Sequence, residues 1–133
     1  MNTEKHVTSL EVSQKLSALG VNKESLFCWQ QNIRDEWYIN DSKLLDFLSD
    51  CYPAYLASEL AEMLPNKITI NGMDYFLDIY PDEEKKSPGW IVGYNYMRAN
   101  LGFKEYTYQE ADSLPDALGK ILIYLIENRL IQL

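Results

Sequence analysis

The stretch DSLPDALGKILIYLIEN, residues 112–128, constrains the fold more than any other part of the chain. Ser113 is placed to cap a helix, and Asp116 follows at the third helical position, where a carboxylate meets the helix dipole. Pro115 is tolerated in the first turn because the N–H groups there have no intrahelical partner. Most of the circumference is then apolar: Leu114, Leu118, Ile121, Leu122, Ile123, Tyr124, Leu125 and Ile126. A helix this apolar is buried on more than one side.

The segment NKITINGMDYFLDIYP, residues 66–81, supplies a sheet for this helix to pack on. Asn71-Gly72 is the preferred pair for a two-residue type I′ turn, which needs positive φ at both centres. The arms of this hairpin are residues 68–70 and 73–80. In the second arm, apolar and mixed positions alternate: Tyr75, Leu77 and Ile79 against Asp74, Phe76 and Asp78. This alternation predicts an antiparallel sheet that is covered on one face only.

Two more aromatic-rich runs extend the sheet to a meander of about four strands. WIVGYNYM, residues 90–97, places Trp90, Val92, Tyr94 and Tyr96 on one face. FKEYTY, residues 103–108, alternates Phe103, Glu105 and Thr107 with Lys104, Tyr106 and Tyr108. The simplest geometry lays the 114–128 helix across one face of this meander.

The N-terminal part of the chain predicts a helix and a hairpin. Residues 1–7 are polar and are expected to be disordered. A helix over 9–19 follows, with Thr8 and Glu11 as a capping box and Gly20 in the left-handed position that ends it.

Two β-prone runs come next, residues 26–29 and 37–39, joined by the polar loop NIRDE in a hairpin. Ser42 is then placed to cap a short helix over 43–49.

Pro53 is expected to stop that short helix and to open the next one, over 54–64. Leu56, Leu60 and Met63 or Leu64 form its inward stripe. The chain of 133 residues is therefore predicted to be a single α+β domain, residues 1–133. Its antiparallel meander and N-terminal hairpin are packed on one face by the C-terminal helix and the proline-led central helix.

The charge pattern argues against nucleic acid as a partner. The net charge is -8, from 12 basic and 20 acidic residues. The basic residues are scattered, and the only tight pair, Lys85–Lys86, directly follows Asp82, Glu83 and Glu84. Nucleic-acid binders instead gather Lys and Arg on one face, because counterion release supplies much of their affinity. An acidic surface suits solubility or a basic protein partner.

No segment predicts a membrane partner or secretion. The N-terminus lacks the apolar core of a signal peptide, and no run approaches the roughly 20 apolar residues that span a bilayer. The expected location is the cytoplasm.

The inventory of catalytic and metal-binding residues is small. His6 is the only histidine, which argues against Ser-His-Asp or Cys-His catalysis and against most zinc sites. No phosphate-binding or nucleophile motif occurs, so we predict no metal, no cofactor and no catalytic residues. Cys28 and Cys51 lack C-x-x-C spacing. Burial is expected for Cys28, and pairing of the two cysteines stays open.

A carboxylate-dependent enzyme, or a small-molecule-binding protein, is the alternative. Asp74 and Asp78 share one strand face, but four residues separate them by roughly 13 Å. That distance exceeds the range of both retaining and inverting carboxylate pairs. Glu105 approaches them only if the strand register allows.

The aromatic content gives the main functional prediction. Trp90, Tyr94, Tyr96, Tyr106 and Tyr108 crowd two neighbouring strands. One sheet face must meet the helix, and the other is either open or covered. Tyrosine and tryptophan on an open face are typical of protein interfaces, whereas on a covered face their polar tips simply reach water. We predict a non-enzymatic binding module whose partner is another protein, with a homodimer as one version.

The apolar residues at the end of the chain have two possible roles. Leu130, Ile131 and Leu133 either cover one end of the core or meet a partner.

Three stretches resemble small proteins of bacteriophages and prophages of gut bacteria, a class without an established activity. They are SLEVSQKLSALGVNKES, YPAYLASELAEMLP and DSLPDALGKILIYLIENRLI. The resemblance covers structural motifs, so it assigns no functional residue. It implies an accessory role in the cytoplasm of a host cell, and by analogy slightly favours host-interaction functions, including inhibitors of host defence.

Overall fold

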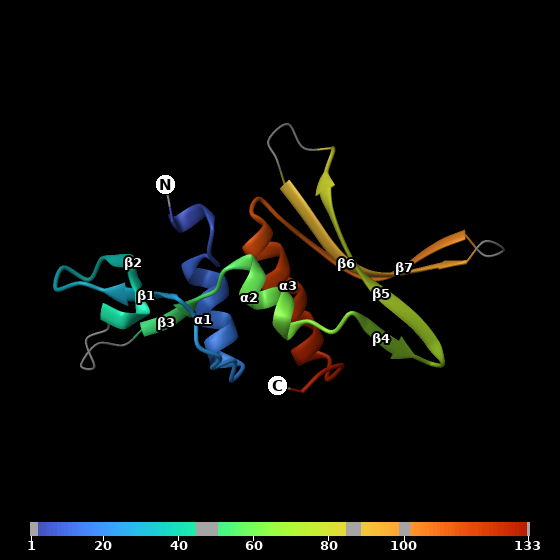
Figure 1. Cartoon of the computed structure of the whole chain (residues 1–133), viewed down its shortest axis with the longest axis horizontal. Helices are drawn as coiled ribbons and strands as arrows, with labels where there is room; N and C mark the ends of the chain where they lie inside the picture. The colour runs from blue at the N-terminus through green and yellow to red at the C-terminus, as the bar shows by residue number, and fades with distance from the viewer. Residues whose placement is uncertain (1–2, 45–50, 85–88, 99–101, 133) are drawn as a thin grey trace.

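Among the described residues, three α-helices lie between two antiparallel sheets (Figure 1). This computed structural model describes residues 3–44, 51–84, 89–98 and 102–132. The smaller sheet has the strand order β2-β1-β3, and the larger has the order β4-β5-β6-β7. The α+β class and the packing of the C-terminal helix on a sheet are confirmed.

The larger sheet is the predicted meander. Its strands are β4 (Lys67–Ile70), β5 (Met73–Asp82), β6 (Gly89–Arg98) and β7 (Gly102–Ala111). Asn71 and Gly72 join β4 to β5 with φ of 51° and 80°, which confirms a turn with positive φ at both centres.

A β-bulge in β7 changes the predicted alternation. Tyr94 pairs with Thr107 and Asn95 pairs with Glu105, so Tyr106 is the extra residue of the bulge. The prediction that Glu105 and Thr107 share a face is therefore wrong. One inserted residue shifts every later side chain relative to the partner strand, and Glu105 comes to lie on the same face as Tyr108.

The helix α3 (Leu114–Glu127) packs on one face of this sheet, with α2 (Ala57–Met63) beside it (Figure 1). Ser113 caps α3 as predicted, because its side-chain oxygen accepts a hydrogen bond from the Asp116 amide at 3.3 Å. The buried residues of α3 are Pro115, Ala117, Leu118, Gly119, Ile121, Leu122, Ile123 and Leu125. The helix is therefore covered on more than one side, as its sequence required. Beyond its end, Leu130 and Ile131 pack half-buried against the same core.

The helix α1 (Leu10–Ala18) lies against the other side of α3. At Gly119 this contact leaves no room for a side chain, because an added Cβ would lie 2.6 Å from Val12 Cγ1. The side chain of Asp116 joins the two helices, because its Oδ1 accepts a hydrogen bond from the Ser9 amide at 2.7 Å.

The predicted start of α1 is wrong by one residue, whereas its end is confirmed. Ser9 is the N-cap, and Thr8 is buried with its Oγ1 accepting a bond from the Tyr55 amide at 3.0 Å. Residue Gly20 has φ of 89°, and the Val21 amide bonds the Leu16 carbonyl at 3.0 Å, which closes the helix end.

The smaller sheet contains the predicted hairpin and one strand that was not predicted. The hairpin strands are β1 (Phe27–Gln31) and β2 (Trp37–Asp41), and the third strand is β3 (Cys51–Ala54). Pro53 lies in β3 rather than at a helix start. Proline is tolerated there because β3 is an edge strand, where one side needs no N–H donor. The central helix consequently begins only at Ala57.

Residues 1–7 were expected to be disordered. Of these, Thr3–Lys5 forms a 3-10 helix and Val7 pairs with Leu56, so residues 3–7 have a defined structure that the local sequence did not indicate. Ser42–Leu44 is a 3-10 turn. Residues 45–50 of the expected short helix lie outside the described residues.

Replacing Gly119 by alanine should destabilise the protein by about 1–3 kcal/mol, because the new methyl group overpacks the contact with Val12. Alanine is the better helix former, so propensity alone predicts the opposite sign. Denaturant unfolding measures the difference. The double variant V12A/G119A tests the cause, since removing Val12 Cγ1 opens space for the new methyl. Strictly additive effects of the two substitutions would show that this contact is not responsible.

Candidate functional site

The face of the larger sheet opposite α3, called the open face below, has no described helix packed against it. Across β5, β6 and β7, strand register and alternation place on it Phe76, Asp78, Tyr80, Ile91, Gly93, Asn95, Glu105, Tyr108 and Glu110. At the β4 end, Lys67, Thr69 and Asp74 lie on the same face. Phe76 is 55% exposed and Tyr108 is 50% exposed. Large aromatic side chains on an uncovered sheet face mark a candidate interaction surface.

The five aromatic residues predicted as a site are divided between the two faces of the sheet. Tyr94 is fully buried beneath α3, and its hydroxyl donates to the Pro65 carbonyl at 2.7 Å. Trp90, Tyr96 and Tyr106 are half-buried and pack against the same core. The ring centroids of Tyr96 and Tyr106 lie 6.1 and 5.2 Å from that of Tyr75.

Only Tyr108 of the five belongs to the open face. The aromatic residues that join it there are Phe76 and Tyr80, which were not among the five predicted site residues. Phe76 and Tyr80 alternate with apolar residues of β5. This alternation was the signal in the sequence that could have assigned them to the face opposite the helix.

A cavity of about 580 Å³ opens at one end of the open face. It is lined by Tyr80, Pro81, Asp82, Glu83, Glu84, Ile91, Glu105, Tyr108 and Glu110. Five of these residues carry carboxylates, and none of the described lining residues is basic. The cavity is therefore both acidic and aromatic.

The side chains of this cavity belong to three adjacent strands. The Tyr80 hydroxyl of β5 donates to Glu105 Oε1 of β7 at 3.4 Å, across β6. Burial raises the pKa of Tyr80, and the nearby Glu105, Asp78 and Tyr108 raise it further. The phenol therefore stays protonated and available as a donor to a carboxylate.

Asn95 adds an unfilled acceptor to the open face. Its side chain is nearly buried, with 7% of the residue exposed, and Nδ2 donates to Asp78 Oδ2 at 2.9 Å. Among the described residues, nothing donates a hydrogen bond to its Oδ1. Buried acceptors are normally paired, so this oxygen is an exception among the described residues.

The carboxylates named for the alternative enzyme do not form one cluster. Asp74 lies near the β4–β5 turn, where Thr69 Oγ1 donates to it at 2.6 Å and Lys67 Nζ approaches at 3.8 Å. Asp78 is held by Asn95, and Glu105 accepts from Tyr80. Only Asp78 and Glu105 approach the same group, the Tyr80 phenol.

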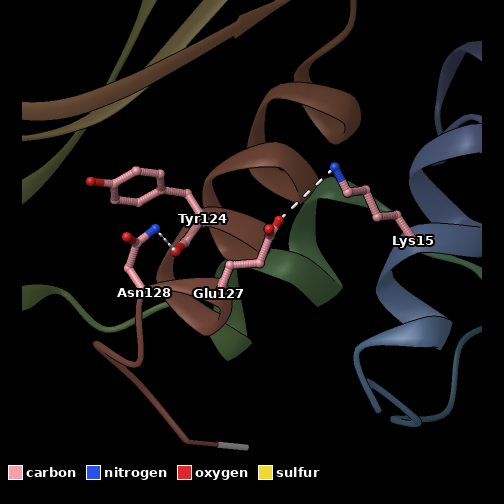
Figure 2. A network of polar contacts seen from close by, with 4 residues as sticks. All are labelled: Lys15, Tyr124, Glu127 and Asn128. Atoms are coloured by element: carbon pink, nitrogen blue, oxygen red, sulfur yellow. Dashed lines mark hydrogen bonds and ion pairs between the residues drawn. The ribbon is translucent and has the colours of Figure 1, made fainter.

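A second hollow, of about 420 Å³, lies between α1 and α3. Figure 2 shows Lys15 Nζ reaching across it to Glu127 Oε1 at 3.9 Å, and Asn128 Nδ2 donating to the Tyr124 carbonyl at 2.8 Å. Charges of both signs line this groove, and the Lys15–Glu127 pair is largely exposed and hence weak. The mixed charge of the groove therefore favours neither a cationic nor an anionic ligand.

A third cavity lies beside the two cysteines. Cys28 is buried, as predicted, and both cysteines are free. Burial, and then the neighbouring Cys51, raises the pKa of Cys28 to about 11. Its thiol is protonated at neutral pH and is therefore a weak nucleophile. In the part of the chain that the structure describes, no three His, Cys, Asp or Glu side chains group to hold a metal ion.

Comparisons with protein-family models, with curated proteins and with solved structures gave no match to this chain. Among the described residues, no helix has both the length and the apolar character needed to cross a membrane.

Replacing Tyr94 by phenylalanine should lower the free energy of unfolding by about 1 kcal/mol at neutral pH, because the Pro65 carbonyl loses its donor. Burial raises the pKa of Tyr94 above that of an unfolded tyrosine. The native protein therefore loses stability as the pH rises above about 10, where unfolded tyrosine ionises. The Y94F variant should show a smaller loss over this alkaline range, measured by denaturant unfolding.

The control for this substitution is Y108F. The Tyr108 ring is half-exposed on the uncovered face of the sheet, so we expect a change within about 0.5 kcal/mol. Equal destabilisation by Y94F and Y108F would contradict the assignment of the two tyrosines to different faces.

Proposed function

We propose that this protein is a non-enzymatic binding module that holds a basic segment of another protein on its open face. The observation that carries the proposal is the acidic and aromatic cavity on an uncovered sheet face. Five carboxylates and two tyrosines line it, with no basic side chain among the described lining residues.

The chemistry of the cavity fits lysine and arginine side chains. Carboxylates attract the cationic group, and the faces of Tyr80 and Tyr108 offer cation–π contact. The apolar side chain of Ile91 lies in the same cavity, where the aliphatic stem of lysine or arginine has apolar surface to cover.

The same charges disfavour a homodimer formed through this face. Two copies related by a twofold axis would bring identical patches together. The carboxylates of Glu105 and Glu110 in one copy would then face carboxylates of the other copy, and juxtaposed like charges oppose association. A basic partner is therefore favoured over a second copy.

The setting of this function is also part of the proposal. The resemblance to phage and prophage proteins implies an accessory role in the cytoplasm of a host bacterium, so we propose a host protein as the partner.

The test uses the paired variant E105Q/E110Q, which removes two charges from the open face. Its affinity for a short lysine-rich peptide, measured by calorimetry, should fall about tenfold, equivalent to about 1.4 kcal/mol. Glutamine at 105 keeps an oxygen that accepts from Tyr80. Wild-type affinity should also fall as salt is raised, because exposed charges are screened.

The matched control is E36Q/E62Q, which makes the same change in net charge at two exposed positions far from this face. It should bind the peptide nearly as well as wild type. Equal weakening by both variants would mean that only overall charge matters, and the open face would not be the site.

A further inference from the structure

We infer that the basic segment binds as an added β-strand along the outer edge of β7, with lysine or arginine at every second position. This inference rests on the proposed function and specifies how the open face would be used. It follows from the edge of the sheet, from its backbone groups, and from the different charges on the two sides of β7.

The first observation is that β7 is a terminal strand. It is ten residues long and pairs with β6 alone. Among its backbone groups, the Glu110 carbonyl accepts a hydrogen bond from Lys120 Nζ at 3.2 Å. An edge with unpaired N–H and C=O groups is a template for another strand.

The second observation identifies the outward groups. The bond from Lys120 shows that the Glu110 carbonyl points away from β6. Backbone directions alternate along an antiparallel strand, so Tyr108 also directs its N–H and C=O outward. A Cβ built on Gly93, its partner in β6, would lie only 3.0 Å from Tyr108 Cβ. Such closeness is typical of the pairs without mutual hydrogen bonds.

The bulge fixes where the available edge begins. Pairing is regular from Thr107 to Ala111, opposite Trp90–Tyr94, and it shifts at Tyr106. The regular stretch contains both Tyr108 and Glu110. These two residues therefore present their side chains to the open face and their backbone groups to the free edge.

The third observation is that the two sides of this edge differ in charge. On the open face, an added strand would place alternate side chains beside Tyr108 and Glu110, next to the acidic cavity. On the helix side, the intervening side chains would approach Gln109 and Lys120, which line the groove between α1 and α3. Basic residues are favoured at one set of positions and uncharged polar residues at the other.

The experiment compares synthetic peptides of the same composition, one alternating lysine with threonine and one with the lysines in a single block. Calorimetry with the full-length protein should show at least about tenfold tighter binding of the alternating peptide. Amide exchange at Tyr108 and Glu110 should slow when the alternating peptide binds, and less so with the block peptide.

Backbone N-methylation gives the decisive control, because it keeps every charge. In a strand added antiparallel to β7, which is the orientation we propose, residues whose side chains lie on the open face direct their own N–H groups towards β7. Methylating the lysine amides should therefore abolish the advantage of the alternating peptide, whereas methylating the threonine amides should leave it nearly intact.

The outcomes separate this inference from the proposed function. Equal binding of the alternating, block and methylated peptides, still weakened by E105Q/E110Q, would overturn strand addition and leave the open face as a site. Equal loss from methylation at either set of positions would also overturn strand addition. No binding of any basic peptide would overturn both proposals.

Discussion

The burial of α3 on two sides is the constraint on which the rest of the structure depends. The sheet β4–β7 covers one side of this helix, and α1 covers another at Gly119, where the Val12 and Leu16 side chains lie against a residue that has none. Asp116 fixes the second contact by accepting the bond from Ser9. Because one face of the sheet is committed to α3, and the helices lie between the two sheets, no described helix is left to cover the opposite face of β5, β6 and β7 (Figure 1).

The elements predicted from the sequence are those with local signals. The cap at Ser113, the Asn71-Gly72 turn and the closure at Gly20 each depend on a few neighbouring residues, and each is confirmed. The strand β3 has no such signal, since its pairing with β1 decides it, and Pro53 suits an edge strand as well as a helix start. Thr8 likewise has the local sequence of a helix cap, but its hydroxyl accepts a hydrogen bond from the amide of Tyr55, which is distant in the sequence.

The candidate site was only partly predictable because one inserted residue changes which side chains share a face. Alternation correctly placed Trp90, Tyr94 and Tyr96 together, since β6 is regular along that stretch. In β7, the bulge at Tyr106 separates Thr107 from Glu105 and brings Glu105 to the face that holds Tyr108. A bulge is fixed by pairing with a partner strand, so this grouping of a carboxylate with a tyrosine was not visible in the sequence.

The acidic residues of the open face also bear on why a free edge is compatible with a stable protein. Exposed edges invite pairing between copies, and natural sheets limit this with charges, bulges and short strands. Here β7 combines three such devices: the bulge at Tyr106, the Lys120 ammonium on the Glu110 carbonyl, and the carboxylates of Glu105 and Glu110. The first two shorten the part of the edge that is free to pair, whereas the carboxylates act through the sign of their charge. Under the function proposed above, they would repel a second copy of this acidic chain and attract a basic segment, so the same side chains would oppose self-association and select the partner.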